Sequence, residues 1–537
     1  MKQKIQEIFR NNKKIILILL YASFFIFSFI SSTGFYGDDA IYATRSIGKL
    51  DYMFADEQST PLQWFDELPF WAHLSYHDIL PLLPAIQHIF LSVHESIFFA
   101  KLPFALMGLS SIFLLYLYVK KAHNETLAIH AAFFLSVNTL FLWASRHSFL
   151  EIGVTFFMLL SLVLLLYYTE NPKKFWLPFA LSLGLVFLTK YTAVFIFPAI
   201  LIYLYVSDKS FLRKRETYFV LGIFLCFVAP VVVYNIGMYN AVGHFDLQIS
   251  RFLGQDTPWR LSGVGAGYVR GLFSVFTALA HSSYVYILLA CSGVVWVAYR
   301  RLHTFMLPLL ILFFSTLLFA FQSSARFLPP MVPFLAIFCG FVTHRFHLKF
   351  GLYMVSKILI YVLGVYFTLF ALNTHWLQKP LVEVIGVTVG GAGSRDLGVY
   401  AMDKYLDSLV QEIHGRHDVY GDLKNKDKYL RKYVGENSIS NAVIVYDEFI
   451  TWFSVIWLFE RRRFYYNIPI LSATEFTKYK DSILPRVSKV IYIKVEGSGP
   501  IDQERKGTED ISGLQKVDSI YTRMNGVAFS IFEWSVN

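Results

Sequence analysis

Residues 13–46 read KKIILILLYASFFIFSFISSTGFYGDDAIYATRS, an apolar run followed closely by two adjacent carboxylates. The run is long enough for a helix to cross a hydrocarbon core of about 30 Å. It is too long for the core of a signal peptide, and no small-residue cleavage site follows it, so we expect a retained membrane anchor. Asp38 and Asp39 then stand where the chain leaves the membrane.

The composition is that of an integral membrane protein. The 537 residues are 55% hydrophobic and only 16% charged, and the mean hydropathy is +0.48. In soluble domains about a quarter of the residues are charged. Long apolar runs recur along the first 375 positions, and by their length we predict a bundle of about eleven membrane helices.

The pattern changes at about residue 381. The long apolar runs stop there, and strand-like segments such as NAVIVYD and VSKVIYIKV alternate with helical ones such as ATEFTKYKDSIL. This alternation is typical of a soluble α/β domain. We therefore predict that residues 1–375 form an all-α polytopic membrane domain with long outer loops at 33–96 and 237–280, and that residues 381–537 form a C-terminal α/β domain.

The charges of the loops predict the orientation. Basic residues cluster in every second loop, at 120–121, 173–174, 209–215, 300–301 and 345–349. Cytoplasmic loops are enriched in Lys and Arg, so we place these loops and the N-terminus in the cytoplasm of a plasma-membrane protein. An odd number of spans then places the acidic pair and the C-terminal domain on the extracytoplasmic face. The net charge of +10 follows from these loops and does not predict a nucleic-acid partner.

Three isolated cations interrupt this pattern on the outer side. They are Arg146 in WASRHSF, Lys190 in FLTKYTA and Arg326 in SSARFLPP. Arg and Lys are the side chains that bind phosphate, so three of them at one depth suit the anionic headgroup of a substrate. The alternative is that each extends to lipid headgroups at the membrane edge.

The first outer loop, residues 33–96, is too long for a simple connection. Apolar residues at helical spacing predict two short helices on the membrane surface, at about 39–49 and 81–93. Binding and catalytic residues are concentrated on loops, so we expect a site in this one.

Five motifs in this order resemble those of one enzyme superfamily. They are the acidic pair followed by AIYA, then HDILPLLP, SRHSFLEIG, the broken hairpin GLVFLTKYTAVFIFPA, and ARFLPPMVPFLA. Over residues 14–345 the chain resembles the GT-C superfamily of polyprenyl-phosphate-dependent glycosyltransferases, and within it the group of protein O-mannosyltransferases and aminoarabinose lipid A transferases. The pair is Asp-Asp rather than the commoner Asp-Glu, and HDILPLL lacks the usual double proline.

The resemblance implies that the leading acid, Asp38, is the base that takes the proton of an acceptor hydroxyl, and that Asp39 orients it or binds the acceptor. Tyr42 follows Asp38 by one helical turn on the same face, where it lines the pocket or only packs. The competing structural interpretation is that Asp38 caps a helix after Gly37 and that Asp39 favours the helix dipole.

Further candidates for substrate binding lie in the outer loops. Asp78 is a second carboxylate for the acceptor, a weak metal ligand together with His77, or another helix cap. The loop 237–280 suits a mobile cover over a lipid headgroup, although ordinary surface loops share its composition. Its basic side chains are His244, Arg251, Arg260 and Arg270. No cluster has the spacing of a strong metal site, so we predict no obligatory ion, while some members of the superfamily bind a divalent cation.

The resemblance implies transfer of a hexose or pentose, with inversion, from a polyprenyl-phosphate sugar to an acceptor hydroxyl of a protein, lipid or glycan. The partners are then the lipid-linked donor, membrane lipids and the acceptor. The alternative function is a transporter or flippase of a lipid-linked or anionic substrate, because many spans and a basic pocket suit that function too. Transporters usually show internal repeats and ionisable residues near the midplane. Here no repeat is visible and the charges concentrate at the outer edge.

Overall fold

The computed structural model describes residues 2–35, 37–47, 71, 79–255, 268–320, 325–349, 353–377, 396–413, 442–448, 452–466, 468–496 and 513–536. The chain divides into two compact units whose segments alternate along the sequence. One, here called the helical unit, comprises Met1–Ile30, Pro69–Ile86 and Lys101–Ser394. The other, here called the mixed unit, comprises Ser31–Leu68, Gln87–Ala100 and Arg395–Asn537.

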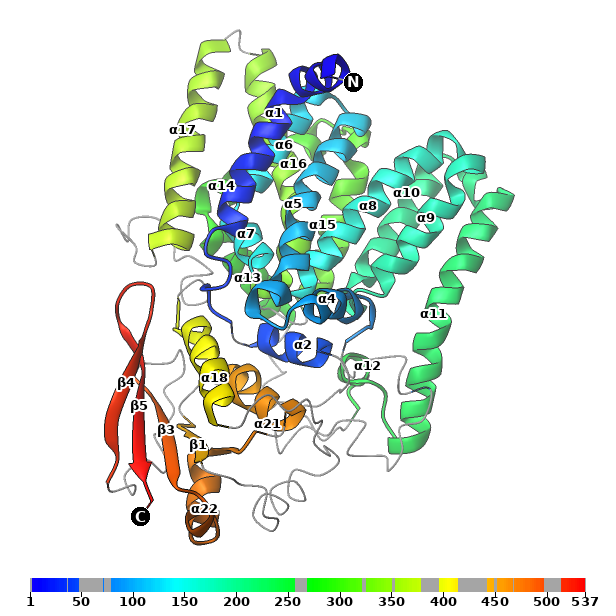
Figure 1. Cartoon of the computed structure of the whole chain (residues 1–537). Coiled ribbons are helices and arrows are strands. Elements are labelled where there is room, and N and C mark those ends of the chain that lie inside the picture. The colour runs from blue at the N-terminus through cyan, green and yellow to red at the C-terminus, as the bar shows by residue number, and fades with distance from the viewer. Residues whose placement is uncertain are drawn as a thin grey trace. The chain divides into compact units, whose positions relative to one another are not determined.

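The helical unit is built from α-helices and short helical turns (Figure 1). Its α-helices are α1 (Lys2–Phe27), α6 (Glu125–Val137), α7 (Thr139–Ser145), α8 (Leu150–Glu170), α9 (Pro172–Phe187), α10 (Ile196–Ser207), α11 (Arg215–Val242), α12 (Leu247–Leu253), α13 (Tyr268–Ser282), α14 (Tyr284–Tyr299), α15 (Met306–Phe319), α16 (Val332–Lys349) and α17 (Tyr353–Leu372). Short helical turns are η2 (Tyr191–Phe195), η3 (Lys209–Arg213), η4 (His303–Phe305), η5 (Ala325–Phe327), η6 (Pro329–Met331) and η7 (Asn373–Leu377). Two further helices, α4 (Leu82–Val93) and α5 (Ile97–Ala122), each contain a boundary between the units.

Several of these helices can cross a membrane. In the described part of the chain, four are long and apolar enough: Ile97–Ala122, Leu150–Glu170, Arg215–Val242 and Lys357–Leu377. Two more pass the same test only as bent pairs, Glu125–Val137 with Thr139–Ser145 and Gly271–Leu279 with Tyr284–Tyr299. The predicted apolar helices are therefore present, while the number eleven stays a prediction.

Helical structure is interrupted at two polar residues of this unit. The first break separates α6 from α7 by a 67° bend, and the side chain of Asn138 accepts a hydrogen bond from the Phe141 amide at 3.0 Å to cap the second helix. The second break follows α9, where Lys190 has extended backbone before η2 begins. The segment GLVFLTKYTAVFIFPA thus contains the break that the sequence predicts, and this break places Lys190 outside regular helix.

Close helix packing in this unit depends on small residues. A Cβ atom on Gly340 of α16 would lie 2.9 Å from the backbone nitrogen of Ala131 in α6. That distance is shorter than real Cβ contacts, so only glycine lets the two backbones approach this far. Van der Waals packing of this kind holds helices together inside a bilayer, where the hydrophobic effect does not.

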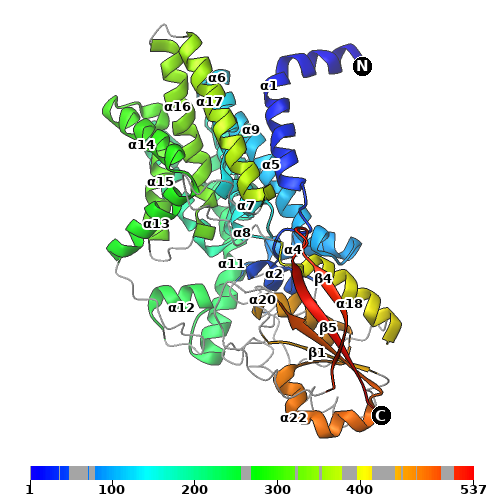
Figure 2. The same ribbon diagram turned by 90° about the vertical axis from the view of Figure 1, so that its left-hand side faces the viewer.

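The mixed unit contains a five-stranded sheet with helices, as the alternating pattern after residue 381 predicts. Its helices are α2 (Asp38–Ser46), α18 (Val399–Ile413), α20 (Trp452–Val455), η8 (Ile456–Glu460), α21 (Arg461–Tyr466), α22 (Ala473–Ile483) and η9 (Leu484–Arg486). Its strands are β1 (Ala442–Tyr446), β2 (Ile470–Ser472), β3 (Lys489–Val495), β4 (Gln515–Tyr521) and β5 (Val527–Ser535), in the order β2-β1-β3-β5-β4. The first three strands are parallel, and β5 runs antiparallel to both β3 and β4. Figure 2 shows β4 and β5 as a long twisted hairpin.

The sheet separates two hydrophobic clusters. Along β1, Ile444 and Tyr446 belong to one cluster, and Val443 and Val445 belong to the other. Successive side chains of a strand point to opposite faces, so the clusters lie on the two sides of the sheet. Strand β1 is buried on both faces, which explains its continuous apolar sequence.

The larger cluster includes residues from the start of the chain. Phe35, Ala40 and Ala43, in and just before α2, are fully buried there together with Trp457 of η8. The predicted helices at about 39–49 and 81–93 are thus present as α2 and α4, and α2 forms part of the core of the mixed unit.

Candidate active site

The acidic pair opens helix α2. Gly37 is the N-cap residue, with φ 64° and ψ −140°, a conformation that residues with a Cβ rarely adopt. Asp38 is the first helical residue, so the interpretation of Asp38 as the helix cap is wrong: glycine takes that position without a side-chain hydrogen bond. The carboxylates of Asp38 and Asp39 lie in the first turn, where the helix dipole stabilises negative charge.

The two carboxylates differ in their surroundings. Asp39 is fully buried, whereas Asp38 is half-buried. The Tyr42 hydroxyl donates a hydrogen bond of 3.0 Å to Oδ2 of Asp38, one turn along the same helical face, as the spacing predicts. Asp38 is therefore both reachable and oriented, which are the two properties that a general base needs.

The segment before the acidic pair is held by the C-terminal part of the chain. The rings of Phe35 and Trp457 meet edge to face with their centroids 5.1 Å apart. The Ser454 hydroxyl donates to the backbone carbonyl of Phe35 at 3.2 Å. The guanidinium of Arg461 lies 4.0 Å above the ring of Trp457. These contacts fix the chain three residues before Asp38.

Arg461 is part of a buried ion network. It contacts Glu95 at 2.6 Å and Asp403 at 3.0 Å, and Arg462 contacts the same oxygen of Asp403 at 2.8 Å. Burial by itself raises the pKa of Asp403, but the charges and hydrogen bonds of Arg462 and Arg461 outweigh it and hold that pKa below its ordinary value. The carboxylate is ionised, and it ties α18 to α21.

The other end of α2 is also anchored. The Ser46 hydroxyl donates to Oε1 of Gln87 at 2.8 Å, and Nε2 of Gln87 donates to the carbonyl of Ala100 at 2.8 Å. The Nδ1–H of His88 donates to the carbonyl of Ser46 at 2.8 Å. Side chains of α4 thus supply hydrogen-bond partners to the polar groups of the last turn of α2.

A second cluster of candidate residues lies in the helical unit. Nζ of Lys190 lies 2.6 Å from Oε1 of Glu151, and both side chains are buried. Lys190 also lies 4.6 Å from the ring centroid of Phe327, and the guanidinium of Arg326 lies 4.7 Å from the same centroid. Three of the sequence motifs, SRHSFLEIG, LTKYTA and ARFLPP, therefore converge at one place.

Arg146 has a different environment from the other two cations. Its side chain is 1% exposed and donates to the backbone carbonyl of Phe25, in the last turn of α1. The last carbonyls of a helix lack intrahelical partners and favour a cation. Arg146 and Lys190 are both buried in protein, so the alternative in which they extend to lipid headgroups does not apply to them.

Sequence reasoning missed a polar network beside Lys190. The hydroxyl of Tyr191 donates to Oδ2 of Asp246 at 2.8 Å, and Asn235 donates to the Tyr191 hydroxyl at 3.3 Å. The amide of Asp246 in turn donates to Oδ1 of Asn235 at 3.1 Å. Asp246 is fully buried. The signal available in the sequence was a carboxylate at the start of the loop 237–280, close to His244.

The remaining candidates are only partly described. His244 is buried, and its Nδ1–H donates to the backbone carbonyl of Phe245 at 2.8 Å. Arg251 stands in α12 and Arg270 in α13. The candidates that lie outside the described residues are His77, Asp78 and Arg260. Among the described residues no group of three or more His, Cys, Asp or Glu side chains could hold a metal ion.

Comparisons with known proteins find a similar overall fold in solved structures and a family match for part of the chain. A family model described as dolichyl-phosphate-mannose-protein mannosyltransferase matches residues 78–234, a range that contains Arg146, Glu151 and Lys190. This match confirms the resemblance that the motifs predict. No curated protein sequence matches significantly.

Among solved structures, the chain is similar to ArnT from Cupriavidus metallidurans bound to undecaprenyl phosphate, with 13% identity over 97% of this chain and 98% of that one and a TM-score of 0.54. The apo state of the same protein gives 13% identity over 98% of both chains and the same TM-score. The oligosaccharyltransferase of Archaeoglobus fulgidus gives 14% identity over 89% of this chain and 67% of that one, with a TM-score of 0.49.

Proposed function

We propose that the chain is an integral membrane glycosyltransferase that moves one sugar from a polyprenyl-phosphate donor to an acceptor hydroxyl on the extracytoplasmic face. The observation that carries this proposal is the Asp38 carboxylate, half-buried and held by Tyr42 in the first turn of α2, in a chain with the GT-C fold. A carboxylate oriented in this way can take a proton from a hydroxyl.

The reaction replaces one C–O bond of the anomeric carbon by another and moves one proton. Asp38 takes the proton of the acceptor hydroxyl, whose oxygen forms a bond to the anomeric carbon of the sugar. The bond from that carbon to the phosphate oxygen breaks, and its electron pair leaves with the polyprenyl phosphate. Attack opposite the leaving group inverts the anomeric centre. Asp39 follows Asp38 in the sequence and is fully buried, so it orients the first turn of the helix and does not react.

The cations of the helical unit have graded roles in this proposal. Arg326 is half-buried and stacks on Phe327, so its guanidinium is the first candidate for the donor phosphate. Lys190 has three N–H donors, of which Glu151 takes one, so it is a second candidate. Arg146 donates a hydrogen bond to a carbonyl at the end of α1, so its role is to stabilise the helix bundle.

Support for a lipid-phosphate donor comes from the comparisons. The matching family is that of the dolichyl-phosphate-mannose-protein mannosyltransferases, and the similar ArnT structure is bound to undecaprenyl phosphate. Dolichyl phosphate and undecaprenyl phosphate are both polyprenyl phosphates. We extend that donor class to this chain, with a protein, lipid or glycan hydroxyl as acceptor and with no obligatory metal ion.

The test is to incubate the purified full-length protein with a panel of polyprenyl-phosphate sugars and an acceptor mixture, and to detect released polyprenyl phosphate by mass spectrometry. Asp38→Asn should abolish release, because an amide of the same shape does not accept the proton. Asp518→Asn, which changes an exposed carboxylate of β4, is the matched control and should leave release unchanged. Release by Asp38→Asn at the wild-type rate would exclude Asp38 as the base.

Two further measurements separate the rival function and the orientation. A flippase would move a fluorescent polyprenyl-phosphate sugar across vesicles without releasing polyprenyl phosphate, whereas we expect release.

For orientation, a cysteine at exposed Lys516 should react with an impermeant maleimide on intact cells, and one at exposed Lys209 only after permeabilisation. The opposite pattern would invert the topology and contradict an extracytoplasmic reaction.

A further inference from the structure

Helices α1 and α17 are joined at one end. The hydroxyls of Tyr21 and Thr368 are 3.2 Å apart, and the Trp376 ring lies 5.3 Å from that of Phe24 and 5.1 Å from that of Phe29. Tyr21, Phe24 and Phe29 belong to the half of the first apolar segment that leads toward residue 30. This end of the helix pair is closed by direct contact.

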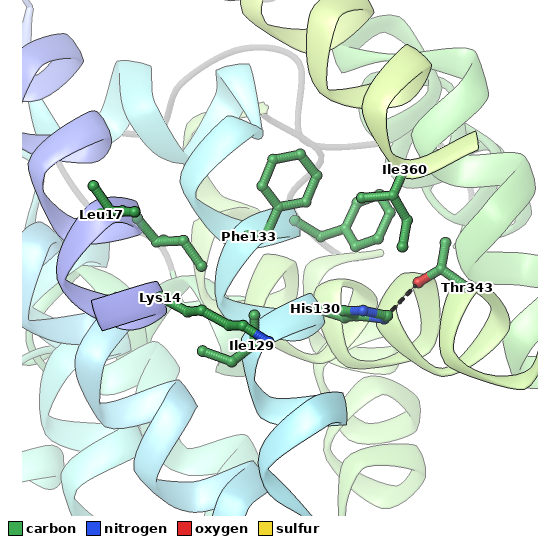
Figure 3. Close-up of a pocket in the computed structure, with 9 residues that line it drawn as sticks. Lys14, Leu17, Ile129, His130, Phe133, Thr343 and Ile360 are labelled. Atoms are coloured by element: carbon green, nitrogen blue, oxygen red, sulfur yellow. Dashed lines mark hydrogen bonds between the residues drawn. The ribbon is translucent and has the colours of Figure 1, made fainter. Parts of the chain in front are cut away.

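Nearer the N-terminal half of α1, a pocket of about 290 Å³ separates the two helices (Figure 3). Leu17 of α1, Phe133 of α6 and Ile360 of α17 line it, and α16 contributes Thr343. Gly364, one turn beyond Ile360, would bring a Cβ to within 3.4 Å of the Phe133 ring, so α17 rests on Phe133 there. The pocket therefore ends where this contact begins.

The pocket is apolar except at one end. The polar side chains on its wall are Lys14, His130 and Thr343, and the last two are 3.1 Å apart and satisfy one another. Figure 3 shows Lys14 extended along α6 toward Ile129. Water needs two to four polar partners, so the apolar part does not suit water. An empty pocket would lose dispersion contacts on every wall.

Hydrocarbon is the kind of ligand that suits the apolar lining of this pocket. The volume is about ten times the roughly 30 Å³ that a water molecule occupies in the liquid, which suits part of one acyl chain and not a whole lipid. Leu17 is 55% exposed, so the pocket opens toward the surroundings of the helix bundle. In a bilayer those surroundings are lipid tails.

The charge at the polar end specifies the headgroup. Lys14 is exposed and stands, with Lys13, where the polar start of α1 gives way to its apolar run. A cation at this boundary lies at headgroup level and attracts anionic lipids. We propose that this pocket binds one acyl chain of an anionic glycerophospholipid, whose phosphate contacts Lys14. The site is independent of the proposed sugar transfer.

The test uses the full-length protein in vesicles of phosphatidylcholine that contain a trace of phosphatidylglycerol with a photoreactive diazirine on one acyl chain. After irradiation, mass spectrometry of the peptides should find the label on segments around Leu17, Phe133 and Ile360. Leu17→Trp fills the pocket and should remove this label. Leu20→Trp is the matched control, because Leu20 is 61% exposed on the same helix and does not line the pocket, and it should keep the label.

The headgroup is tested separately. Lys14→Gln should lower labelling by the phosphatidylglycerol probe about two- to fivefold, the loss expected for one exposed ion pair, and should not alter labelling by a phosphatidylcholine probe. Equal labelling of Leu17→Trp and Leu20→Trp would refute the site. Equal labelling by both lipids would refute the anionic headgroup. Stronger labelling by a diazirine polyprenyl phosphate would assign the pocket to the donor and overturn the proposal.

Discussion

Lys190 and Glu151 form a buried ion pair, with Nζ and Oε1 2.6 Å apart and both side chains shielded from solvent. The pair joins the break after α9 to the first turn of α8. Each charge compensates the other in a region of low dielectric, so the loss of either partner leaves an uncompensated buried charge. The cation is thus part of the fold as well as a candidate for the donor phosphate.

Replacement of Glu151 by Gln should therefore destabilise the helical unit by about 3–5 kcal/mol, the cost of breaking a buried pair. The double variant Glu151→Leu with Lys190→Met should recover most of this loss, because it removes both charges. Thermal unfolding in detergent measures both variants. A double variant less stable than Glu151→Gln would show that Lys190 is stabilised by other groups.

Tyr42→Phe should lower kcat while donor affinity stays the same. The change removes one hydrogen bond to a carboxylate, a loss of about 1.5–3 kcal/mol that corresponds to roughly tenfold to hundredfold in rate. Steady-state kinetics with the donor that the panel identifies provides the measurement. An unchanged kcat would mean that the 3.0 Å contact to Asp38 does not orient the base.

Arg326→Gln and Arg146→Gln should affect different properties, the first donor binding and the second stability. The first should weaken donor binding by about 1.5–3 kcal/mol, the range for a lost charge-assisted hydrogen bond. The second should lower the unfolding temperature with little change in donor affinity, because Arg146 bonds the end of α1. Equilibrium donor binding and thermal unfolding, measured on both variants, separate the two roles, and a reversal of the pattern would exchange the assignments.

Trp457→Leu should lower kcat without changing donor affinity, because Trp457 holds Phe35, three residues before the proposed base. Trp534→Leu is the matched control. It also replaces a tryptophan of the mixed unit, but one that packs against the cluster on the other side of the sheet. Equal losses of kcat in the two variants would indicate general damage to the mixed unit and not a specific effect on α2.

Acid should destabilise the mixed unit through Asp403. Its pKa in the folded protein lies below the ordinary value of 3.8 because Arg462 and Arg461 outweigh the effect of burial. A carboxyl group with a depressed folded pKa contributes stability above pH 4, and this contribution is lost as the pH falls through the folded pKa. Asp403→Asn should be less stable at neutral pH and should lose this acid dependence, which thermal unfolding between about pH 3 and 7 would measure.

Local features of the fold were predictable because they depend on neighbouring residues. The length of an apolar run predicts a membrane helix, and apolar residues at helical spacing predicted the two short helices at about 39–49 and 81–93. Strand β4 was not predicted, because its own residues carry no strand signal. Most of its side chains are exposed, and QKVDSIY shows no clean alternation of apolar and polar residues. Its pairing with β5 supplies the order that its own pattern does not.

The site was predictable in its cations and acids but not in their partners. Glu151 stands in a motif that the sequence singles out, yet its partner Lys190 follows 39 residues later, and no local pattern connects them. Asp246 was missed in the same way, because Tyr191 lies 55 residues from it in sequence. Contacts at such separations depend on how the helices pack, which residue spacing does not encode.

The shared core of Phe35 and Trp457 also sets the order in which the protein can mature. Phe35 and Ser454, which are hydrogen-bonded, are 419 positions apart, so at about 5 to 20 residues per second the ribosome makes the second partner roughly 20 to 80 s after the first. During that interval the acidic-pair helix has been synthesised but lacks the partners that bury it. Ala528, Phe529 and Ile531 of β5 belong to the same cluster, so even a late stop codon that removes the last strand would leave α2 with an incomplete core. A nascent chain should therefore complete the core around α2 only after β5 has been synthesised.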